Sequence, residues 1–198
     1  MIYGLIAVIG YLLGSINVAI VYIRRRYRAD IRDEGSGNAG ATNVARVHGL
    51  GAGLLTLGTD MLKAAAAGWI GWRLAGETGL AVACAASFTG HCWPVYFGFR
   101  GGKGVSVAAC IALLFDWRFF LMLLALFAAV FLLSRKVSLC SVTAAVCYPG
   151  LYYLLHPGFG PAFFVCCYIM AVVVYLHRGN IRRLLRGEEP DFRPGKRG

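Results

Sequence analysis

Charged residues are scarce in this sequence, and their scarcity excludes a soluble globular domain. Only 15% of the 198 residues are Asp, Glu, Lys or Arg, and 59% are hydrophobic, whereas a soluble domain carries about 25% charged residues. Residues 1–23 contain no charge, and about 20 apolar residues in a helix suffice to cross a bilayer core of about 30 Å. The composition therefore predicts an integral membrane protein.

A basic segment in front of the first apolar run is also missing. The run begins directly at Met1, and its positive cluster, from Arg24 to Arg28, follows it. A cleaved signal peptide has the opposite order, with a basic start before a shorter apolar region. We therefore expect an uncleaved first span whose N-terminus lies outside.

The sequence has little that could hold a metal or form a disulfide framework. Only nine residues are acidic, and the seven cysteines are odd in number, form no CxxC pair and lie in or beside apolar segments. We interpret the cysteines as small packing residues and expect no metal and no cofactor. The net charge of +11 comes from residues that flank apolar segments, which indicates membrane lipid and anionic substrates as partners rather than nucleic acid.

Seven apolar segments are candidate spans, and short connections, several with Gly or Pro, separate them. They are 2–23, about 51–72, 78–98, 103–115, 119–134, 138–155 and 159–177. A turn at Asp116-Trp117-Arg118 keeps two charges out of the bilayer centre, whereas a single crossing over 105–133 would bury them. We predict an all-α membrane protein with seven transmembrane helices, and five spans are the alternative.

Basic residues are distributed unevenly over the two sides of this seven-span order. With the N-terminus outside, 17 of the 20 Lys and Arg fall on or next to the inner side. Only Arg73 and Arg118 fall outside, and Lys63 lies within a span. Because basic residues favour the cytoplasmic side, the sequence predicts a cytoplasmic C-terminus and one polytopic domain over residues 1–198.

The sequence changes character after the last predicted span. Residues 179–186 place Ile181, Leu184 and Leu185 on one helical face and three arginines on the rest. This pattern is typical of a short amphipathic helix lying on the inner interface. The tail over 187–198, which contains Pro and Gly, is expected to be disordered.

The first glycine-rich polar segment is GSGNAGATNVAR at 35–46. Its glycines allow backbone N–H groups to converge on an anion, and its short polar side chains add further donors. Arg46 adds a planar fork that fits phosphate oxygens. For such a loop taken alone, a flexible polar turn between two spans is the ordinary alternative.

The second glycine-rich segment surrounds Lys103, from Gly98 to Val105. It differs from a Walker A loop because Gly104 stands where Ser or Thr is required and no strand precedes it, so ATP binding is not expected. A lysine among glycines at the foot of a span can still bind an anion. A basic cytoplasmic hairpin without a ligand is the alternative.

Two smaller polar groups lie at the predicted inner side as well. His177 and Asn180 share a face if the last helix continues, and a neutral imidazole there can accept a proton or hold a substrate. Ser138 and Ser141 stand at the mouth of a span, where serines are commonly helix caps. In the predicted topology both groups and both glycine-rich segments share one face, which indicates a site for more than one phosphate that is open to apolar chains.

We expect three ionisable residues within the predicted spans to have a structural role. Asp60 and Lys63 lie three residues apart in one span, a spacing at which opposite charges pair. His91, which precedes Trp93-Pro94, is interpreted as a structural or interfacial residue rather than as a base.

Together these segments resemble a bacterial family, the PlsY-type glycerol-3-phosphate acyltransferases that use acyl phosphate. The resemblance is carried by GSGNAGATNVAR (35–46), TDMLK (59–63), GHCWPVYFGF (90–99), GGKGV (101–105), SLCSVT (138–143) and HRGNIRRLLRGEE (177–189). It covers nearly the whole chain in order. Ala39, Cys140 and Gly179 depart from the family pattern, and none of them removes an expected donor or cation.

The resemblance implies seven membrane helices in the bacterial inner membrane, with the active site at the cytoplasmic face. The implied reaction moves a fatty acyl group from acyl phosphate to the 1-hydroxyl of sn-glycerol 3-phosphate, giving lysophosphatidate and phosphate. This is the first acylation step of phospholipid biosynthesis. A soluble enzyme that produces the acyl phosphate is a further expected partner.

The resemblance also implies the residues of the site. The expected catalytic residues are Ser36, Arg46, Lys103, His177 and Asn180. The residues expected to bind substrate or phosphate are Gly37, Asn38, Gly40, Thr42, Asn43, Gly101, Gly102, Ser138 and Ser141. Because acyl phosphate is a mixed anhydride with a good leaving group, the hydroxyl can attack directly while cations stabilise the developing charge.

A membrane transporter of a phosphorylated metabolite is the alternative function. Transporters usually bind their substrate near the middle of the membrane, between internal repeats. This sequence has no evident repeat, and its polar groups are predicted to gather at one face. Those two features favour the enzyme.

Overall fold

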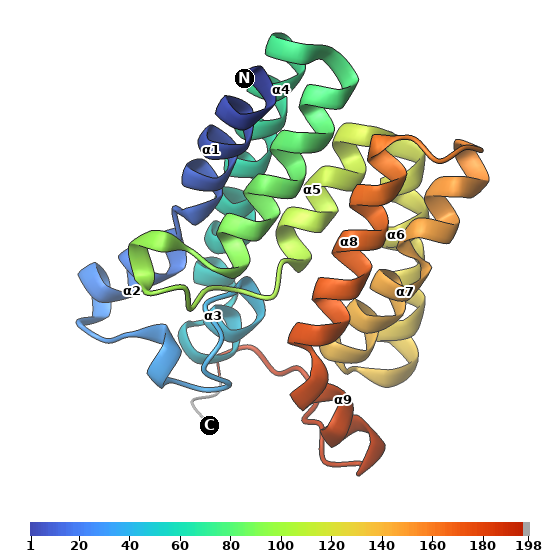
Figure 1. The fold of residues 1–198 in the computed structure, drawn as a ribbon. Coiled ribbons are helices and arrows are strands. Elements are labelled where there is room, and N and C mark those ends of the chain that lie inside the picture. The colour runs from blue at the N-terminus through green and yellow to red at the C-terminus, as the bar shows by residue number, and fades with distance from the viewer. Residues whose placement is uncertain (196–198) are drawn as a thin grey trace.

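The computed structural model describes residues 1–195, and every regular element in this part of the chain is helical (Figure 1). The α-helices are α1 Ile2–Ser15, α2 Val18–Tyr27, α3 Ala41–His48, α4 Leu50–Cys92, α5 Val105–Phe115, α6 Trp117–Ser134, α7 Val137–Leu155, α8 Pro161–Leu176 and α9 Arg178–Leu185. Two short 3-10 turns, Ile31–Asp33 and Val95–Phe97, lie in the connections. The predicted all-helical fold is confirmed.

The first predicted span and helix α4 each contain a break. The first divides at Ile16 and Asn17, where the Asn17 side chain accepts a hydrogen bond of 3.1 Å from Ile20 N and so caps α2. Helix α4 leaves helical geometry at Ala75 and Gly76, and Gly76 has a φ of 59°. Helix α4 therefore consists of two segments joined at a tight turn, close to where the sequence separates spans 51–72 and 78–98.

Small residues let α1 pack closely against α4. A Cβ at Gly10 would lie 2.9 Å from Ala83 O, and a Cβ at Gly14 would collide with the backbone of Ser87. Close backbone approach through small residues is typical of helices that pack within a membrane. This contact joins the start of the chain to the second segment of α4.

Helices α5 to α8 pack beside α4 (Figure 1). The core between them consists mainly of small and aliphatic residues, and it includes the rings of Phe88, Phe119 and Tyr148. The rings of Phe119 and Tyr148 meet edge to face with centroids 4.7 Å apart, and the Tyr148 hydroxyl donates to Ala108 O at 2.8 Å. The turn between α5 and α6 falls at Asp116, whose side chain caps α6 by accepting from Arg118 N at 2.7 Å. The predicted turn at this position is confirmed.

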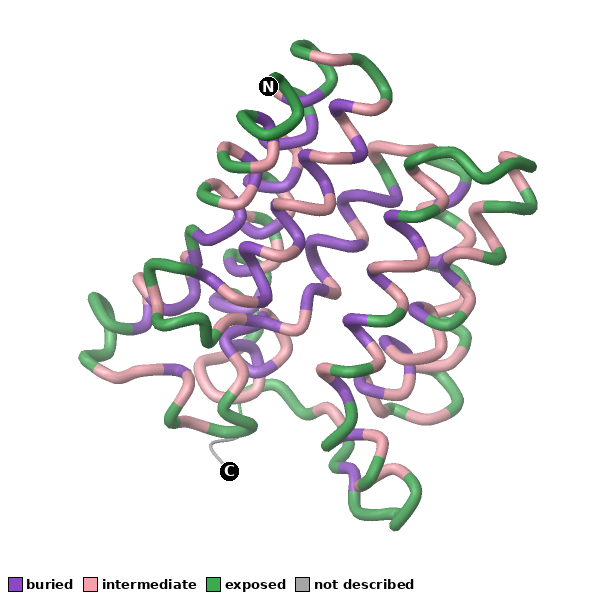
Figure 2. The backbone as a smooth tube through the Cα atoms, viewed as in Figure 1, coloured by how far each residue is buried: buried purple, intermediate pink, exposed green. Residues whose placement is uncertain are grey.

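Apolar side chains also cover the outside of the bundle. Buried residues run through its centre (Figure 2), yet Leu132 and Leu133 of α6 are 80% and 89% exposed. Three stretches of the described chain are long and apolar enough to cross a membrane, namely Ile2–Tyr27, Trp117–Ser134 and Val137–Leu155. The pair α8–α9, bent by 60°, makes a fourth if it is a single span.

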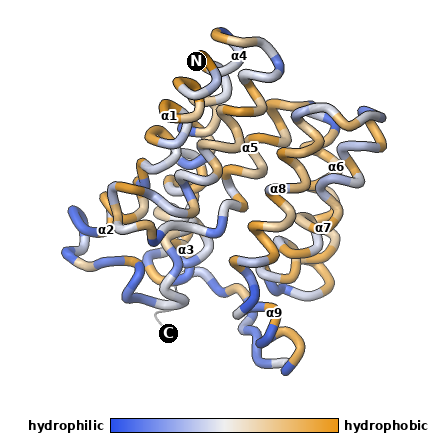
Figure 3. The backbone as a smooth tube through the Cα atoms, viewed as in Figure 1, coloured by the Kyte–Doolittle hydropathy of each residue, from blue (hydrophilic) through white to orange (hydrophobic). Residues whose placement is uncertain are grey.

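The most hydrophilic stretches gather at one end of the molecule, around α2, α3 and α9 (Figure 3). Helix α9 corresponds to the amphipathic helix expected from the sequence, and it begins directly after the bend at His177. This end is where the polar segments singled out in the sequence come together.

The segment after α9 differs from the expected disordered tail as far as residue 195. Phe192 N donates to Arg135 O at 2.9 Å, Asp191 pairs with Lys136 at 2.8 Å, and Gly195 N donates to Ala45 O at 3.1 Å. The segment therefore runs from α9 past Arg135 and Lys136 to α3, at the hydrophilic end of the molecule. Residues 196–198, which belong to the same prediction, lie outside the described residues.

Candidate active site

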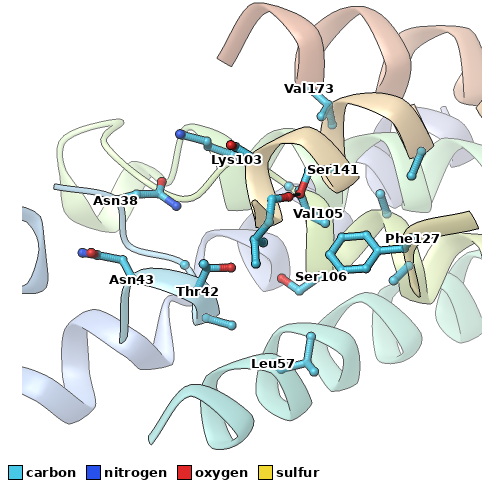
Figure 4. Close-up of a pocket in the computed structure, with 18 of the residues that line it drawn as sticks. Asn38, Thr42, Asn43, Leu57, Lys103, Val105, Ser106, Phe127, Ser141 and Val173 are labelled. Carbon is cyan, nitrogen blue, oxygen red and sulfur yellow. Dashed lines mark hydrogen bonds between the residues drawn. The ribbon is translucent and has the colours of Figure 1, made fainter. Parts of the chain in front are cut away.

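A cavity of about 450 Å³ lies between α3, the first segment of α4, the start of α5, and helices α6 to α8. Its lining changes from polar to apolar across the cavity: Figure 4 shows Asn38, Thr42 and Lys103 on one side and Phe127 and Leu57 on the other. The predicted site residues that line it are Ser36, Asn38, Gly40, Thr42, Asn43, Arg46, Lys103, Ser138, Ser141, His177 and Asn180. Gly37, Gly101 and Gly102 do not line it.

The loop over 35–40 is held in shape by one side chain, Asn43. Its Oδ1 accepts from Ser36 N at 2.8 Å, and its Nδ2 donates to Ile31 O at 3.2 Å and to Glu34 O at 2.9 Å. Asn43 is 1% exposed, and both N–H groups of its amide are engaged within the chain. Asn43 thus organises the loop, and the substrate-binding role that the resemblance implies for it stays a prediction.

With the loop held in this way, the start of α3 faces the cavity. Helix α3 has no side-chain cap, and the N–H groups of Gly40, Ala41 and Thr42 have no acceptor within residues 1–195. All three residues line the cavity. A helix N-terminus with free N–H groups favours a bound anion. Arg46, one turn further along α3, also lines the cavity and makes no ion pair within the same residues.

The second glycine-rich loop contributes a side chain, Lys103, to the cavity and not its backbone N–H groups. Gly101 N donates to Cys92 O at 3.2 Å and Gly102 N donates to His91 O at 3.1 Å. These N–H groups are therefore not available to an anion. The expected binding role of Gly101 and Gly102 thus does not match their geometry, and Lys103 is the group that this loop contributes.

Lys103 reaches the cavity in a strongly basic environment. Its ammonium donates to Asn180 Oδ1. The pKa of Lys103 is lowered to about 8, first by burial and then by the positive charges of Arg183, Arg46 and Arg178, while Glu189 acts in the opposite direction. A lysine that is partly desolvated and surrounded by cations lacks a strong counter-ion, so an anionic ligand is its natural partner.

The bend between α8 and α9 brings His177 and Asn180 to the cavity. His177 is 4% exposed, and its Nδ1 lies 2.8 Å from Val173 O, which can only accept. Nδ1 of the neutral ring therefore carries the proton, and the Nε2 lone pair is left to accept one. Asn180 Nδ2 donates to Glu189 Oε1 at 2.7 Å, which fixes the amide so that its oxygen faces Lys103.

Ser138 and Ser141 line the cavity from the first turns of α7. Ser141 Oγ donates to Val137 O at 2.8 Å, one turn earlier in the same helix. Ser138 Oγ is buried and makes no hydrogen bond of normal geometry in the part of the chain that the structure describes, although it lies close enough to Glu189 to help lower the pKa of that carboxyl. A buried hydroxyl without a partner costs free energy, so Ser138 is a favourable position for a ligand oxygen.

Glu189 was missed as a site residue from the sequence. It is 5% exposed, lines the cavity, and accepts from Asn180 and from Arg183 Nε, the latter at 2.7 Å. It belongs to the last segment on which the resemblance depends, HRGNIRRLLRGEE, and that was the available signal. The residue also falls within 187–198, the tail that is expected from the sequence to be disordered.

The helical fold, with apolar side chains covering its outside, defines an integral membrane protein. A family model described as glycerol-3-phosphate acyltransferase matches residues 4–187. The chain belongs to this family, the PlsY-type glycerol-3-phosphate acyltransferases, which are integral membrane enzymes of phospholipid synthesis. The family decides between the two functions weighed from the sequence, in favour of the acyltransferase.

Relatives of similar length carry the same description. The chain is 37% identical to a glycerol-3-phosphate acyltransferase of Erythrobacter litoralis, over 93% of this chain and 92% of the relative. It is 43% identical to one of Thioalkalivibrio sulfidiphilus, over 91% and 89%.

The fold is also similar to crystal structures of PlsY, an integral membrane glycerol 3-phosphate acyltransferase. The glycerol 3-phosphate form has a TM-score of 0.89 at 36% identity, and 96% of each chain is covered. The lysophosphatidic acid form has a TM-score of 0.86 at 34% identity, with 96% of this chain and 95% of that chain covered.

Proposed function

We propose that this enzyme transfers a fatty acyl group from acyl phosphate to the 1-hydroxyl of sn-glycerol 3-phosphate, releasing lysophosphatidate and phosphate. The observation that carries the proposal is the two-sided cavity. Its polar side combines Arg46, Lys103 and the free N–H groups of α3, whereas its apolar side is lined by residues such as Leu57 and Phe127. A phosphate and an acyl chain can therefore occupy one cavity together.

The polar side supplies what the reaction requires. The 1-hydroxyl oxygen attacks the carbonyl carbon of acyl phosphate, and the bond from that carbon to the phosphate oxygen breaks. The hydroxyl proton passes to His177 Nε2 or to an oxygen of the departing phosphate. Lys103 and Arg46 bind the phosphate of glycerol 3-phosphate, and their positive charges also stabilise the negative charge that develops on the carbonyl and leaving oxygens. The leaving group is good enough that no covalent nucleophile takes part.

His177 and Asn180 act mainly by placement. The hydrogen bond from His177 Nδ1 to Val173 O holds the ring with its acceptor nitrogen free. Glu189 holds the Asn180 amide, whose oxygen accepts from Lys103. Ser36, Asn38, Thr42, Ser138 and Ser141 complete the set of short polar side chains around the two phosphates.

We place the cavity at the cytoplasmic face of the bacterial inner membrane, in a single domain that crosses it seven times with the N-terminus outside. The two segments of α4 account for two crossings, and α5 to α8 for four more. Of the 20 Lys and Arg, 17 fall on or next to the inner side in this order, as the distribution of basic residues in membrane proteins favours. A cytoplasmic opening suits glycerol 3-phosphate and a soluble enzyme that supplies the acyl phosphate.

A donor comparison tests the proposal. Purified protein in detergent, with EDTA present, is given glycerol 3-phosphate and either acyl phosphate or acyl-CoA, and lysophosphatidate is quantified. We expect product from acyl phosphate only, with one phosphate released per acyl group transferred. Product from acyl-CoA at an equal rate would refute the proposed donor, and product that requires added metal would refute the mechanism.

A further inference from the structure

Three ionisable side chains outside the proposed catalytic set are buried together beside the second glycine-rich loop. Asp60, Lys63 and His91 are 2%, 8% and 1% exposed. Asp60 and Lys63 belong to the first segment of α4 and His91 to the second. The predicted pairing of Asp60 with Lys63 is confirmed, with 2.9 Å between Nζ and Oδ1. Charges inside a membrane protein are costly and usually serve a specific purpose.

The contacts of Lys63 determine which nitrogen of the neutral His91 ring carries the proton. The ammonium has three N–H groups, and it lies 2.7 Å from Ile16 O, 2.9 Å from Asp60 Oδ1 and 3.1 Å from His91 Nδ1. Asp60 Oδ1 is a second neighbour of His91 Nδ1, at 3.3 Å. Because the Lys63 ammonium lies closer and can only donate, we assign Nδ1 as its acceptor and place the proton of the neutral ring on Nε2. The ring is thereby fixed in one orientation.

The same cluster connects four parts of the fold. Ile16 O belongs to the break between α1 and α2, and Asp60 Oδ2 accepts from Ser106 Oγ at 2.9 Å in the first turn of α5. Lys63 and His91 join the two segments of α4. The cluster therefore holds the two helices between which the loop over 98–104 runs: the end of α4, through His91, and the start of α5, through Ser106.

The loop is shaped directly on His91. His91 O accepts from Gly102 N at 3.1 Å, and the ring occupies the space in which a side chain at residue 102 would lie. A Cβ at Gly102 would stand 2.8 Å from Cε1 of the ring and closer still to Nε2, and a Cβ at Gly104 would overlap the ring of Phe88. Lys103 stands between these two glycines, so the positions of both rings determine where its backbone lies.

We propose that His91 is a positioning residue for Lys103, with its ring fixed by the Asp60–Lys63 pair and its ring and carbonyl holding Gly102. The assignment rests on the proposed function in one respect, namely that Lys103 binds a substrate phosphate. His91 is itself part of the cavity lining, and the role assigned to it here is exerted through the loop. Gly101 and Gly102 allow the loop to pack closely against α4, and this packing places the ammonium of Lys103 in the cavity.

The geometry suggests a pair of substitutions that compensate for each other. His91→Asn keeps an oxygen that can accept from Lys63 but removes the far half of the ring, which leaves a gap beside Gly102. Gly102→Ala places a methyl group where that half of the ring lies. Each single variant should displace Lys103, and in the double variant the methyl group should fill the gap.

The test measures KM for glycerol 3-phosphate, and also its equilibrium binding in the absence of any acyl donor. We expect each single variant to raise KM about tenfold, the loss of about one charged hydrogen bond, and the double variant to return within about threefold of the wild type. If Gly102→Ala does not fold, expression and activity of the double variant give the same answer. Losses in the double variant that equal the product of the single losses, or His91→Asn binding like the wild type, would overturn the proposal.

A second readout separates positioning from simple stabilisation. Loosening the loop exposes Lys103 to water, so the alkaline limb of kcat/KM should move to higher pH in His91→Asn, while Arg46, Arg178, Arg183 and Glu189 around it are unchanged. An unmoved limb together with only a lower melting temperature would overturn the proposal. His156→Asn is the matched control, since His156 also contacts a carboxylate, Asp116 at 2.9 Å. His156 lies in the connection between α7 and α8 and is not among the residues that line the cavity, so the KM of this variant should equal that of the wild type.

The outcome is independent of the acyl donor. If the protein does not use acyl phosphate but the double variant of His91 and Gly102 recovers glycerol 3-phosphate binding, the proposed reaction is refuted and the role of His91 is supported. If the donor comparison succeeds and the binding losses multiply, the reaction stands and the role of His91 falls.

Discussion

The two glycine-rich loops have similar compositions but opposite constructions. In the loop over 35–40 a side chain, Asn43, holds the fold, and the backbone N–H groups at the start of α3 are left facing the cavity. In the loop over 98–104 backbone N–H groups hold the fold against α4, and a side chain, Lys103, reaches the cavity. Glycine content alone therefore does not identify an anion-binding backbone. What matters is where the N–H groups of the loop are already engaged.

The largest effect should come from removing the side chain that holds the first loop. Asn43→Ala abolishes three hydrogen bonds of a residue that is 1% exposed, and at about 1 kcal/mol each this should destabilise the protein by about 3 kcal/mol. We expect a lower melting temperature in detergent and a rise of well over tenfold in KM for glycerol 3-phosphate.

Asn38→Ala is the control for that substitution. Asn38 also lines the cavity, and its side chain makes no hydrogen bond within residues 1–195. It should raise KM without a change in melting temperature. Equal melting temperatures for the two variants would contradict the division between a residue that holds the loop and one that faces the ligand.

A smaller effect should appear in the pH dependence, through the side chain that the second loop contributes. Because the pKa of Lys103 is lowered to about 8, its ammonium loses its proton as pH rises through that value. The cation is the required form, so kcat/KM should fall about tenfold per unit above the pKa. Lys103→Arg keeps the charge at all accessible pH values and should lack this limb, even if its maximum rate is lower. If kcat/KM of the arginine variant falls at the same pH, the group that titrates is not Lys103.

The smallest effect should come from a glycine of the second loop that lacks a packing role. Gly98 has a φ of 64°, and no atom lies within 4 Å of a Cβ built on it. Gly98→Ala should cost only the strain of the left-handed backbone, about 1 kcal/mol, and change KM less than about threefold. A loss as large as that of Gly102→Ala would mean that the loop is generally intolerant and would remove the special role of His91.

Features that depend on local sequence could be predicted. The turn at Asp116 follows from the cost of burying its charge, and the pairing of Asp60 with Lys63 follows from their spacing on one helix. The polar segments were recognised because glycines, amides and cations cluster there. Most of them line one cavity.

Features that depend on long-range contacts could not be predicted. Gly101 and Gly102 look like an anion nest until their N–H groups are seen to donate to the end of α4. Glu189 looks like part of a solvated tail until the chain turns back and its carboxylate meets Asn180 and Arg183. In both cases the partner is supplied by the fold, and no local pattern records it.

The central claim is that Arg46 and Lys103, delivered by loops of opposite construction, hold the same phosphate. Equilibrium binding of radiolabelled glycerol 3-phosphate to purified protein tests this most directly, with Arg46→Ala, Lys103→Ala and, as a control, Arg186→Ala, which removes an exposed cation of the same end outside the cavity. We predict that each of the first two variants weakens binding by at least about tenfold and that the control binds like the wild type. Wild-type affinity in either Arg46→Ala or Lys103→Ala would contradict the account.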